Sequence, residues 1–295
     1  MQKIKLITDS ASDIPAEKAK ELNIKVIPFP VTVDGKSYLE GENITKDEFF
    51  TLLDSTESLP STAQITFPQF TEIFEQYYNE GYTELIYISI SSNGSATYSN
   101  AERAKDEFFE EHPEACGRMN IHTVNSYGYT GIYGYASIIA GEMIQKGNTA
   151  EEILSYLHEW FESAELYFAP YTLKYVKRSG RLSAAAAFAG ELLGLRPIIQ
   201  LIDGVSNVPS KVRGDKNIAP KLVQITKDRI IKGSPYIIIT GSVPEYSAEL
   251  EKQLTENLGY PPVWNYKIGA TIASHAGHKV AGVIFKGEKR NHSES

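Results

Sequence analysis

The chain has 295 residues, 42% hydrophobic and 22% charged, which suits a globular protein of one large or two ordinary domains. Its net charge of −8 disfavours a nucleic-acid partner, because phosphate binding needs a basic surface. Cys116 is the only cysteine, so a disulfide framework and a thiolate metal cluster are excluded. With no signal-peptide segment and no apolar run of roughly 18–20 residues, we expect a cytoplasmic protein without stable membrane insertion.

The first half of the sequence alternates strands and helices. The expected strands are residues 3–8, 26–33, 84–88 and 119–124. The expected helices are residues 15–22, 45–53, 66–81, 98–111, 127–145 and 149–161, three of which begin with a capping box such as Thr45-x-x-Glu48. This alternation predicts a mostly parallel α/β sheet, in which ligands bind where the strands end.

The second half changes character. Its expected strands are residues 166–169, 197–202, 205–213, 236–240, 263–268 and 280–285, and its expected helices are 173–195, 217–232 and 245–258. Asp203-Gly204 is a hairpin signal, so this sheet should be mixed. We therefore predict an N-terminal lobe of about residues 1–163, a C-terminal lobe of about 164–286, and a frayed polar tail over 287–295.

The turn between residues 84–88 and the helix at 98–111 is rich in hydroxyls. Ser91, Ser92, Ser95 and Thr97 lie here with Asn93 and Gly94. A strand that ends in such a loop and opens into a helix leaves free backbone N–H groups, which favour a carboxylate or a phosphate. The turn is therefore a candidate anion site.

Other candidate residues each have a structural alternative. Asp9 and Asp13 suggest a metal site or an acid pair, but either Ser12 or Asp13 could instead cap a helix. Thr62 alone reads as an ordinary loop threonine. His275 and His278 form H-x-x-H without a glutamate or cysteine cluster, so a metal is weakly supported, and His275 could instead donate a hydrogen bond to an anion.

Two longer segments are also ambiguous. Residues 174–181 concentrate cations, either as a solvated basic face or as a rim that meets an anionic ligand or an acidic partner. Residues 184–190 are mostly small, which allows either close packing or a tunnel. No nucleotide-binding loop and no nucleophile elbow occurs in the sequence.

Taken together, these segments resemble the DegV family of bacterial fatty-acid-binding proteins over about residues 3–286. The matching pieces occur in order along the chain: 7–10, 61–64, 91–98, 173–176, 180–183, 193–198 and 275–277. Departures from the family pattern include Asn93-Gly94, Asn125 and His278-Lys279. The resemblance implies a two-lobed α/β protein that buries one long-chain fatty acid, such as palmitate, between its lobes.

The resemblance also implies specific residue roles. The fatty-acid carboxylate would be held by Thr62, Ser95, His275 and Arg181, with Arg213 as an additional candidate. The tail would run past Ala185, Phe188 and Ala189.

Some family members present the bound acid to a separate fatty acid kinase subunit. Lys174, Lys177 and Arg178 are the candidate docking residues here. On this reading the protein is a non-enzymatic carrier in lipid transport or fatty-acid metabolism, with no metal and no cofactor. The alternative is a small-molecule phosphotransferase or hydrolase that uses His275 and the hydroxyl turn.

Overall fold

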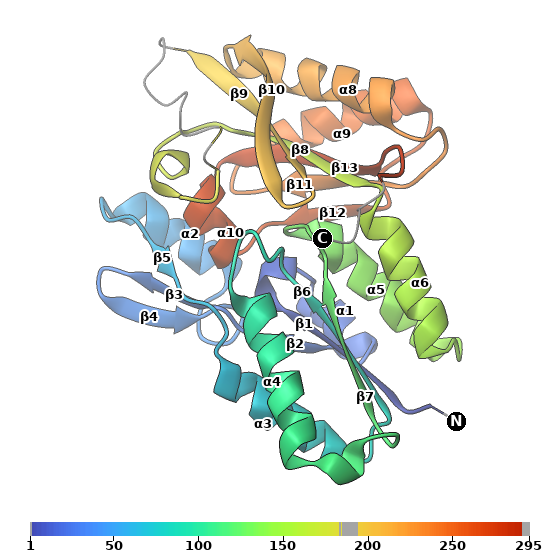
Figure 1. The fold of residues 1–295 in the computed structure, drawn as a ribbon. Helices are drawn as coiled ribbons and strands as arrows, with labels where there is room; N and C mark the ends of the chain where they lie inside the picture. The colour runs from blue at the N-terminus through green and yellow to red at the C-terminus, as the bar shows by residue number, and fades with distance from the viewer. Residues whose placement is uncertain (1, 183, 185–193, 291–295) are drawn as a thin grey trace.

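A computed structural model of the chain describes residues 2–182, 184 and 194–290. These residues form two α/β lobes, one from each half of the chain, drawn in blue to green and in yellow to red (Figure 1). The predicted fold class, a parallel sheet followed by a mixed one, is confirmed. Within the described residues, no helix has the length and apolar character needed to cross a membrane.

The N-terminal lobe contains a four-stranded parallel sheet. Its order is β2 (Lys25–Ile27), β1 (Ile4–Asp9), β6 (Glu84–Ser89) and β7 (Asn120–Asn125). All six residues of β6 are buried, as expected for a strand covered on both faces. The turns that follow β1, β6 and β7 lie at one edge of the sheet, because these strands are parallel and in register.

Two pairs of helices pack against this sheet. The lobe's helices are α1 (Ala16–Glu21), α2 (Lys46–Ser55), α3 (Phe67–Asn79), α4 (Thr97–Glu111), α5 (Gly131–Gln145) and α6 (Ala150–Phe161). The ring of Phe70 on α3 lies 4.9 Å from that of Tyr87 on β6, and α3 packs beside α4. On the α5–α6 side, the Trp160 indole N–H donates to the carbonyl of Ile132 at 2.8 Å. The three predicted capping boxes all form.

The expected strand at 26–33 is divided between two sheets. Proline has no backbone N–H to donate to a ladder; Pro28 follows β2, and Pro30 is the first residue of β3 (Pro30–Val33). β3 pairs with β4 (Lys36–Leu39) through the predicted Asp34-Gly35 turn and with β5 (Ser61–Thr62) on its other side. This second sheet brings Thr62 toward the C-terminal lobe, and β5 was not predicted.

The C-terminal lobe contains a six-stranded mixed sheet. Its order is β10 (Val205–Arg213), β9 (Leu195–Ile202), β8 (Ala164–Pro170), β13 (Val280–Lys286), β11 (Tyr236–Thr240) and β12 (Trp264–Lys267). The helices α8 (Ile218–Arg229) and α9 (Pro244–Leu258) pack together against it. The β9–β10 hairpin turns at Asp203 and Gly204, both with positive φ, as its sequence predicts.

Side-chain alternation gives the two faces of this sheet different roles. On β8, Tyr167 and Ala169 join the core beneath α8 and α9, whereas Leu166 and Phe168 join the core that is continuous with the N-terminal lobe. Ile238 and Ile239 on β11 divide in the same way. Because successive side chains of a strand point to opposite faces, one sheet serves both its own helices and the space between the lobes.

The structure corrects two of the expected helices and contains one helix that was not expected. Residues 173–182 are not α-helical; they contain only the 3-10 helix η3 (Val176–Arg178), and Gly180 has a positive φ that interrupts a helix. Residues 183 and 185–193 of the expected helix lie outside the described residues, and its last residue, Leu195, begins strand β9 instead. The helix expected from residue 127 begins at Gly131, because Tyr127 and Thr130 have positive φ. The helix α10 (Ala270–Ala276) was not predicted, and it lies beside α2 (Figure 1).

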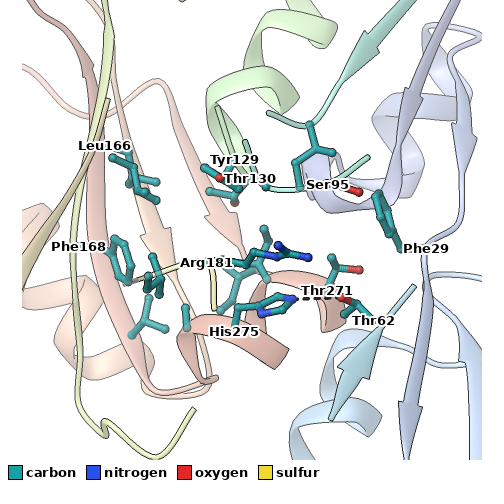
Figure 2. A pocket seen from close by; sticks show the side chains of 18 of the residues that line it. Phe29, Thr62, Ser95, Tyr129, Thr130, Leu166, Phe168, Arg181, Thr271 and His275 are labelled. Carbon is teal, nitrogen blue, oxygen red and sulfur yellow. Dashed lines mark hydrogen bonds between the residues drawn. The ribbon is translucent and has the colours of Figure 1, made fainter. Parts of the chain in front are cut away.

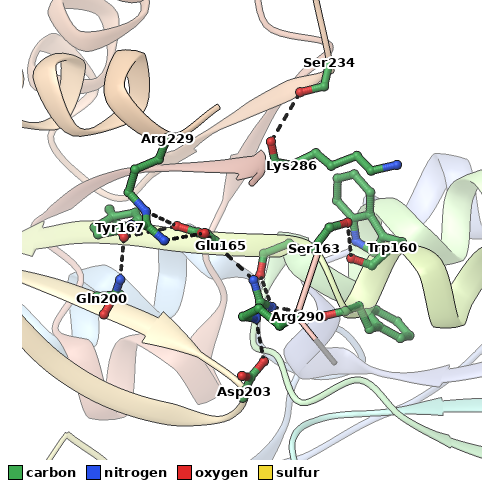
Figure 3. A network of polar contacts seen from close by, with 12 residues as sticks. Trp160, Ser163, Glu165, Tyr167, Gln200, Asp203, Arg229, Ser234, Lys286 and Arg290 are labelled. Carbon is green, nitrogen blue, oxygen red and sulfur yellow. Dashed lines mark hydrogen bonds and ion pairs between the residues drawn. The ribbon is translucent and has the colours of Figure 1, made fainter. Parts of the chain in front are cut away.

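The part of the polar tail that the structure describes is not frayed. Gly287 N–H donates to the carbonyl of Ser163 at 2.8 Å. Arg290 donates from Nε to Asp203 at 3.0 Å and from Nη2 to the carbonyls of Phe161 and Ala164 at 3.2 and 3.0 Å (Figure 3). Residues 287–290 therefore bind the junction of the lobes to the tip of the β9–β10 hairpin. The polar composition of the tail predicted fraying, because it does not show that Arg290 donates to backbone carbonyls of the lobe junction.

Candidate functional site

A cavity of about 390 Å³ lies between the lobes (Figure 2). Hydroxyl and cationic side chains gather in one part of it, and the C-terminal sheet supplies an apolar wall. The polar side chains that line it are Thr62, Gln64, Ser95, Tyr129, Thr130, Arg181, Thr271 and His275. The larger apolar ones are Phe29, Ile90, Leu166, Phe168, Leu182, Leu201, Ile239, Ile268, Ile272 and Val280.

Ser95 is presented by the turn between β6 and α4. Its hydroxyl lies 2.8 Å from that of Thr97 and accepts from the Thr97 N–H at 3.2 Å. Thr97 is in turn held by the Ile65 N–H, which donates to its hydroxyl at 3.2 Å. Ser95 remains half-buried at the cavity wall, so its hydroxyl is oriented by the helix start and still faces the cavity.

Thr62 and His275 come from different lobes and meet in the cavity. Thr62 lies on β5, whose pairing with Val31 of β3 fixes its direction. Its hydroxyl is 3.1 Å from His275 Nε2, and His275 Nδ1 is 3.3 Å from the hydroxyl of Ser179. Figure 2 shows the Thr62–His275 contact as a dashed line. A ligand oxygen at this point would therefore contact both lobes.

The charge of this site is set by His275 and Arg181. Burial lowers the pKa of His275 from its ordinary value, and the nearby positive charge of Arg181 lowers it further. His275 is therefore neutral at pH 7, and one ring nitrogen can donate. Arg181 lines the same cavity, and its side chain points toward the region of His275 (Figure 2). It is the positively charged side chain of the described cavity lining.

The structure does not bring every predicted site residue to the cavity. Arg213 is exposed at the end of β10 and is absent from the described lining. Lys174, Lys177 and Arg178 are exposed on the segment that leads to Arg181, and Lys174 donates to the carbonyl of Thr56 at 3.2 Å. The predicted tail-tunnel residues Ala185, Phe188 and Ala189 lie outside the described residues.

The acidic pair near the start of the chain has a structural role that neither sequence alternative described. Asp9 is fully buried and accepts hydrogen bonds from Tyr87 at 3.0 Å, Tyr133 at 2.5 Å and the Ile90 N–H at 3.1 Å. Burial raises the pKa of Asp9 to about 6, against the lowering effect of these donors. Asp13 accepts from the N–H of Gly269 at 2.6 Å, in the opposite lobe. Asp13 thus binds the residue that begins α10 and also forms an ion pair of 3.8 Å with Lys46 of α2, but it does not cap α1.

The two histidines of H-x-x-H face different partners. His278 is buried, with Nδ1 2.8 Å from the Ser242 hydroxyl and Nε2 3.2 Å from an Asp54 oxygen. His275 contacts Thr62 and Ser179. No carboxylate is a hydrogen-bond partner of His275 within residues 2–182, 184 and 194–290. The ring therefore lacks the orienting acid that general-base catalysis commonly uses.

Comparison with known proteins supplies the context for this geometry. Residues 3–288 match the model of the family described as "Uncharacterised protein, DegV family". The chain belongs to the DegV family. A DegV domain-containing protein from Caldanaerobacter subterraneus subsp. tengcongensis is similar to it, with 31% identity over 288 residues, 97% of this chain and 99% of the relative. A DegV domain-containing protein from Clostridium perfringens is 29% identical, over 97% of this chain and 99% of its own length.

Solved structures of other proteins share the fold. A DegV family protein from Thermus thermophilus, described as binding fatty acid, matches with a TM-score of 0.84 and 26% identity, over 97% of this chain and 100% of its own. A stearic acid-binding protein from Eubacterium ventriosum matches with a TM-score of 0.85 and 24% identity, over 97% of this chain and 98% of its own. The family resemblance noted in the sequence is thus confirmed over nearly the whole chain.

Several cavity residues were missed from sequence. Phe29 was placed inside a continuous strand, and Tyr129 and Thr130 inside a helix. Thr271 lies one helical turn before His275, and this spacing would have identified it if α10 had been recognised. Tyr129 and Thr130 had a weaker signal, because they follow Gly128 after a predicted strand end.

Proposed function

We propose that this DegV protein binds one long-chain fatty acid between its lobes. The carboxylate would lie among Thr62, Ser95, His275 and Arg181, and the tail would run along the apolar wall formed by β8, β9 and β11. The observation that carries the proposal is the division of one cavity into a part with hydroxyls and a cation and a part with apolar side chains. The fatty-acid binding described for the Thermus thermophilus relative supports the same assignment.

The physical chemistry of a fatty acid suits this division. Burial of the tail contributes roughly 0.8 kcal/mol per methylene. A carboxylate removed from water must be hydrogen-bonded, and charge-assisted hydrogen bonds are the stronger kind. Two hydroxyls, a neutral histidine and an arginine supply such donors, and no acidic side chain is among the described residues that line the cavity.

The proposed role needs no bond to be made or broken by this chain. The ligand would be the bound fatty acid, with no cofactor and no metal, and the function would be transport or presentation of the acid in fatty-acid metabolism in the cytoplasm. The pairing of His275 with two hydroxyls, and not with a carboxylate, supports a binding role.

Native mass spectrometry of the purified protein tests the proposal. We expect a co-purified C14–C18 acid, a chain-length range suggested by the family resemblance, at one molecule per chain. After the lipid has been removed, added palmitate should restore the same mass increment. A protein that is reproducibly empty, fails to take up palmitate and turns over a phosphate or ester substrate would overturn the proposal in favour of an enzyme.

We further propose that a separate fatty acid kinase subunit docks on Lys174, Lys177 and Arg178. These three side chains are exposed on the segment that leads to Arg181, so a partner bound there would lie beside the carboxylate end of the cavity. Their charge favours an acidic partner surface.

The double substitution Lys177→Glu and Arg178→Glu tests this docking. It should lower acyl-phosphate formation by a partner kinase at least about tenfold, since reversed charges repel the partner during encounter. Palmitate binding should stay within about twofold of the parent, because neither side chain lines the described cavity. Lys232→Glu with Lys252→Glu, exposed and on other segments, is the matched control. Equal loss of palmitate binding and phosphorylation would count against docking.

A further inference from the structure

Glu40 joins two walls of the cavity from behind. It is 5% exposed and lies between β4 and α2. Its Oε2 accepts from the Ser10 hydroxyl at 2.7 Å and from the Thr271 hydroxyl at 2.6 Å, and its Oε1 accepts from the Thr271 N–H at 3.2 Å. One buried N-terminal-lobe carboxylate thus binds both the side chain and the backbone of the first turn of α10.

Glu40 is also linked to Phe29, a second residue of the cavity lining. The Ser10 hydroxyl that donates to Glu40 accepts from the Phe29 N–H at 2.9 Å, and the Glu40 N–H donates to the Phe29 carbonyl at 3.1 Å. Phe29 and Thr271 both line the cavity. Glu40 itself does not appear in the described lining, so it can act on a ligand only through these neighbours.

The backbone at Gly269 packs closely against the carboxylates of Glu40 and Asp13. Gly269 begins α10 as its N-cap, and its N–H donates to Asp13 at 2.6 Å. A Cβ added there would lie 2.1 Å from Glu40 Oε1 and 2.7 Å from Asp13 Oδ1. The backbone at Gly269 has φ −102°, which any residue can adopt, so glycine is needed for space and not for conformation. The two carboxylates therefore fix how closely α10 approaches the N-terminal lobe.

The position of α10 decides where His275 lies. Thr271 and His275 are four residues apart and lie on one side of the helix, facing the same cavity. His275 Nε2 meets Thr62 from the N-terminal lobe at 3.1 Å, a contact that a shift of 1 Å would break. We infer that Glu40 is a positioning residue of the carboxylate site, which seats α10 so that His275 meets Thr62.

The expected effect of Glu40 on fatty-acid affinity rests on the proposed function. A second measurement, on the ligand-free protein, is independent of it. Glu40→Ala removes every acceptor that α10 uses on this side chain. Glu40→Gln keeps the shape and one carbonyl acceptor. Glu84→Gln is the matched control, because Glu84 is also buried and accepts from Asn120 at 3.0 Å but lies at the start of β6, the end of the strand away from the Ser91–Thr97 turn.

Palmitate titration gives the first readout. We expect Glu40→Ala to weaken binding at least tenfold, Glu40→Gln to weaken it less, and Glu84→Gln to leave it within twofold. In a His275→Ala background, Glu40→Ala should add no more than twofold, because the inferred effect of Glu40 passes through the position of His275. An unchanged affinity in Glu40→Ala, or the same large loss in both backgrounds, would overturn the inference.

The His275 ring gives the second readout, by NMR titration of the ligand-free protein. In the parent, the pKa of His275 is lowered by burial and by Arg181. Glu40→Ala, or Glu40→Gln should the alanine variant not fold, should move the midpoint toward the ordinary histidine value, whereas Glu84→Gln should not. An unmoved midpoint in a folded Glu40 variant contradicts the inference. A parent that fails to bind palmitate while this midpoint moves would refute the proposed function and leave the positioning role standing.

Discussion

Two polar turns lie at the same edge of the N-terminal sheet and have opposite roles. The first runs from Asp9 at the end of β1 to Asp13, and both acids are buried and bound by donors of the protein itself. The turn after β6, residues 91–97, carries neutral hydroxyls, and Ser95 faces the cavity. The acids hold elements and lobes together, and the neutral turn lines the cavity.

The difference follows from charge. A carboxylate that faced the cavity would repel a fatty-acid head group and would cost several kcal/mol to desolvate. Buried behind the cavity, the same carboxylates accept hydrogen bonds from Tyr87, Tyr133 and Gly269. Hydroxyls pay neither cost and can donate to an incoming anion.

The largest effect on stability should come from Asp9→Ala. This change leaves the hydroxyls of Tyr87 and Tyr133 and the N–H of Ile90 without their buried acceptor. We expect the free energy of unfolding to fall by on the order of 3 kcal/mol or more, because each unmet buried donor costs about 1–3 kcal/mol. Urea denaturation measures it. Ser95→Ala should lower the same free energy by less than about 1.5 kcal/mol; equal losses would erase the contrast between the turns.

The largest effect on binding should come from the other turn and its partner across the cavity. Thr62→Ala with Ser95→Ala should weaken palmitate binding at least about thirtyfold, because a hydrogen bond to a charged group contributes about 1.5–3 kcal/mol. Ser92→Ala is the control within the same turn, since the Ser92 hydroxyl accepts from Asn125 at 2.7 Å and is absent from the described lining. Affinity that survives the double substitution would place the head group elsewhere.

A smaller effect concerns pH. Burial raises the pKa of Asp9 to about 6, while the unfolded chain ionises near pH 4. Between these values the folded state holds the extra proton, so this group's contribution to stability is fully present below pH 4 and is lost as pH rises to about 6. Relative to the parent, Asp9→Asn should therefore gain up to about 1.4 kcal/mol per pH unit across that window. A difference that stays constant with pH would contradict the raised pKa.

The sequence predicted those elements of the fold that depend on residues close together in the chain. The parallel sheet, the hairpin at Asp203-Gly204 and the three capping boxes follow from apolar patterns and turn residues a few positions apart. The division of residues 26–33 into two strands was missed. Pro28 and Pro30 are compatible with one edge strand, and the sequence does not show that the two halves join different sheets. Helix α10 was missed because seven residues give too short a pattern.

The residues that line the site could be predicted from sequence, but the buried residues that hold them in place could not. Thr62, Ser95, His275 and Arg181 were named from their resemblance to family motifs, and the structure places all four at one cavity. Glu40 gave no local signal, because its partners Ser10 and Thr271 are 30 and 231 residues away in the chain. Contacts of that range depend on how the lobes close on each other.

The proposed function places a fatty-acid carboxylate among Thr62, Ser95, His275 and Arg181. NMR of bound palmitate labelled with ¹³C at its carboxyl tests this most directly. We expect one ¹³C resonance from an ionised carboxylate at pH 7, which shifts in Thr62→Ala, Ser95→Ala and His275→Ala but not in Ser92→Ala. A resonance that ignores the first three substitutions, or that matches free palmitate in solution, would contradict it.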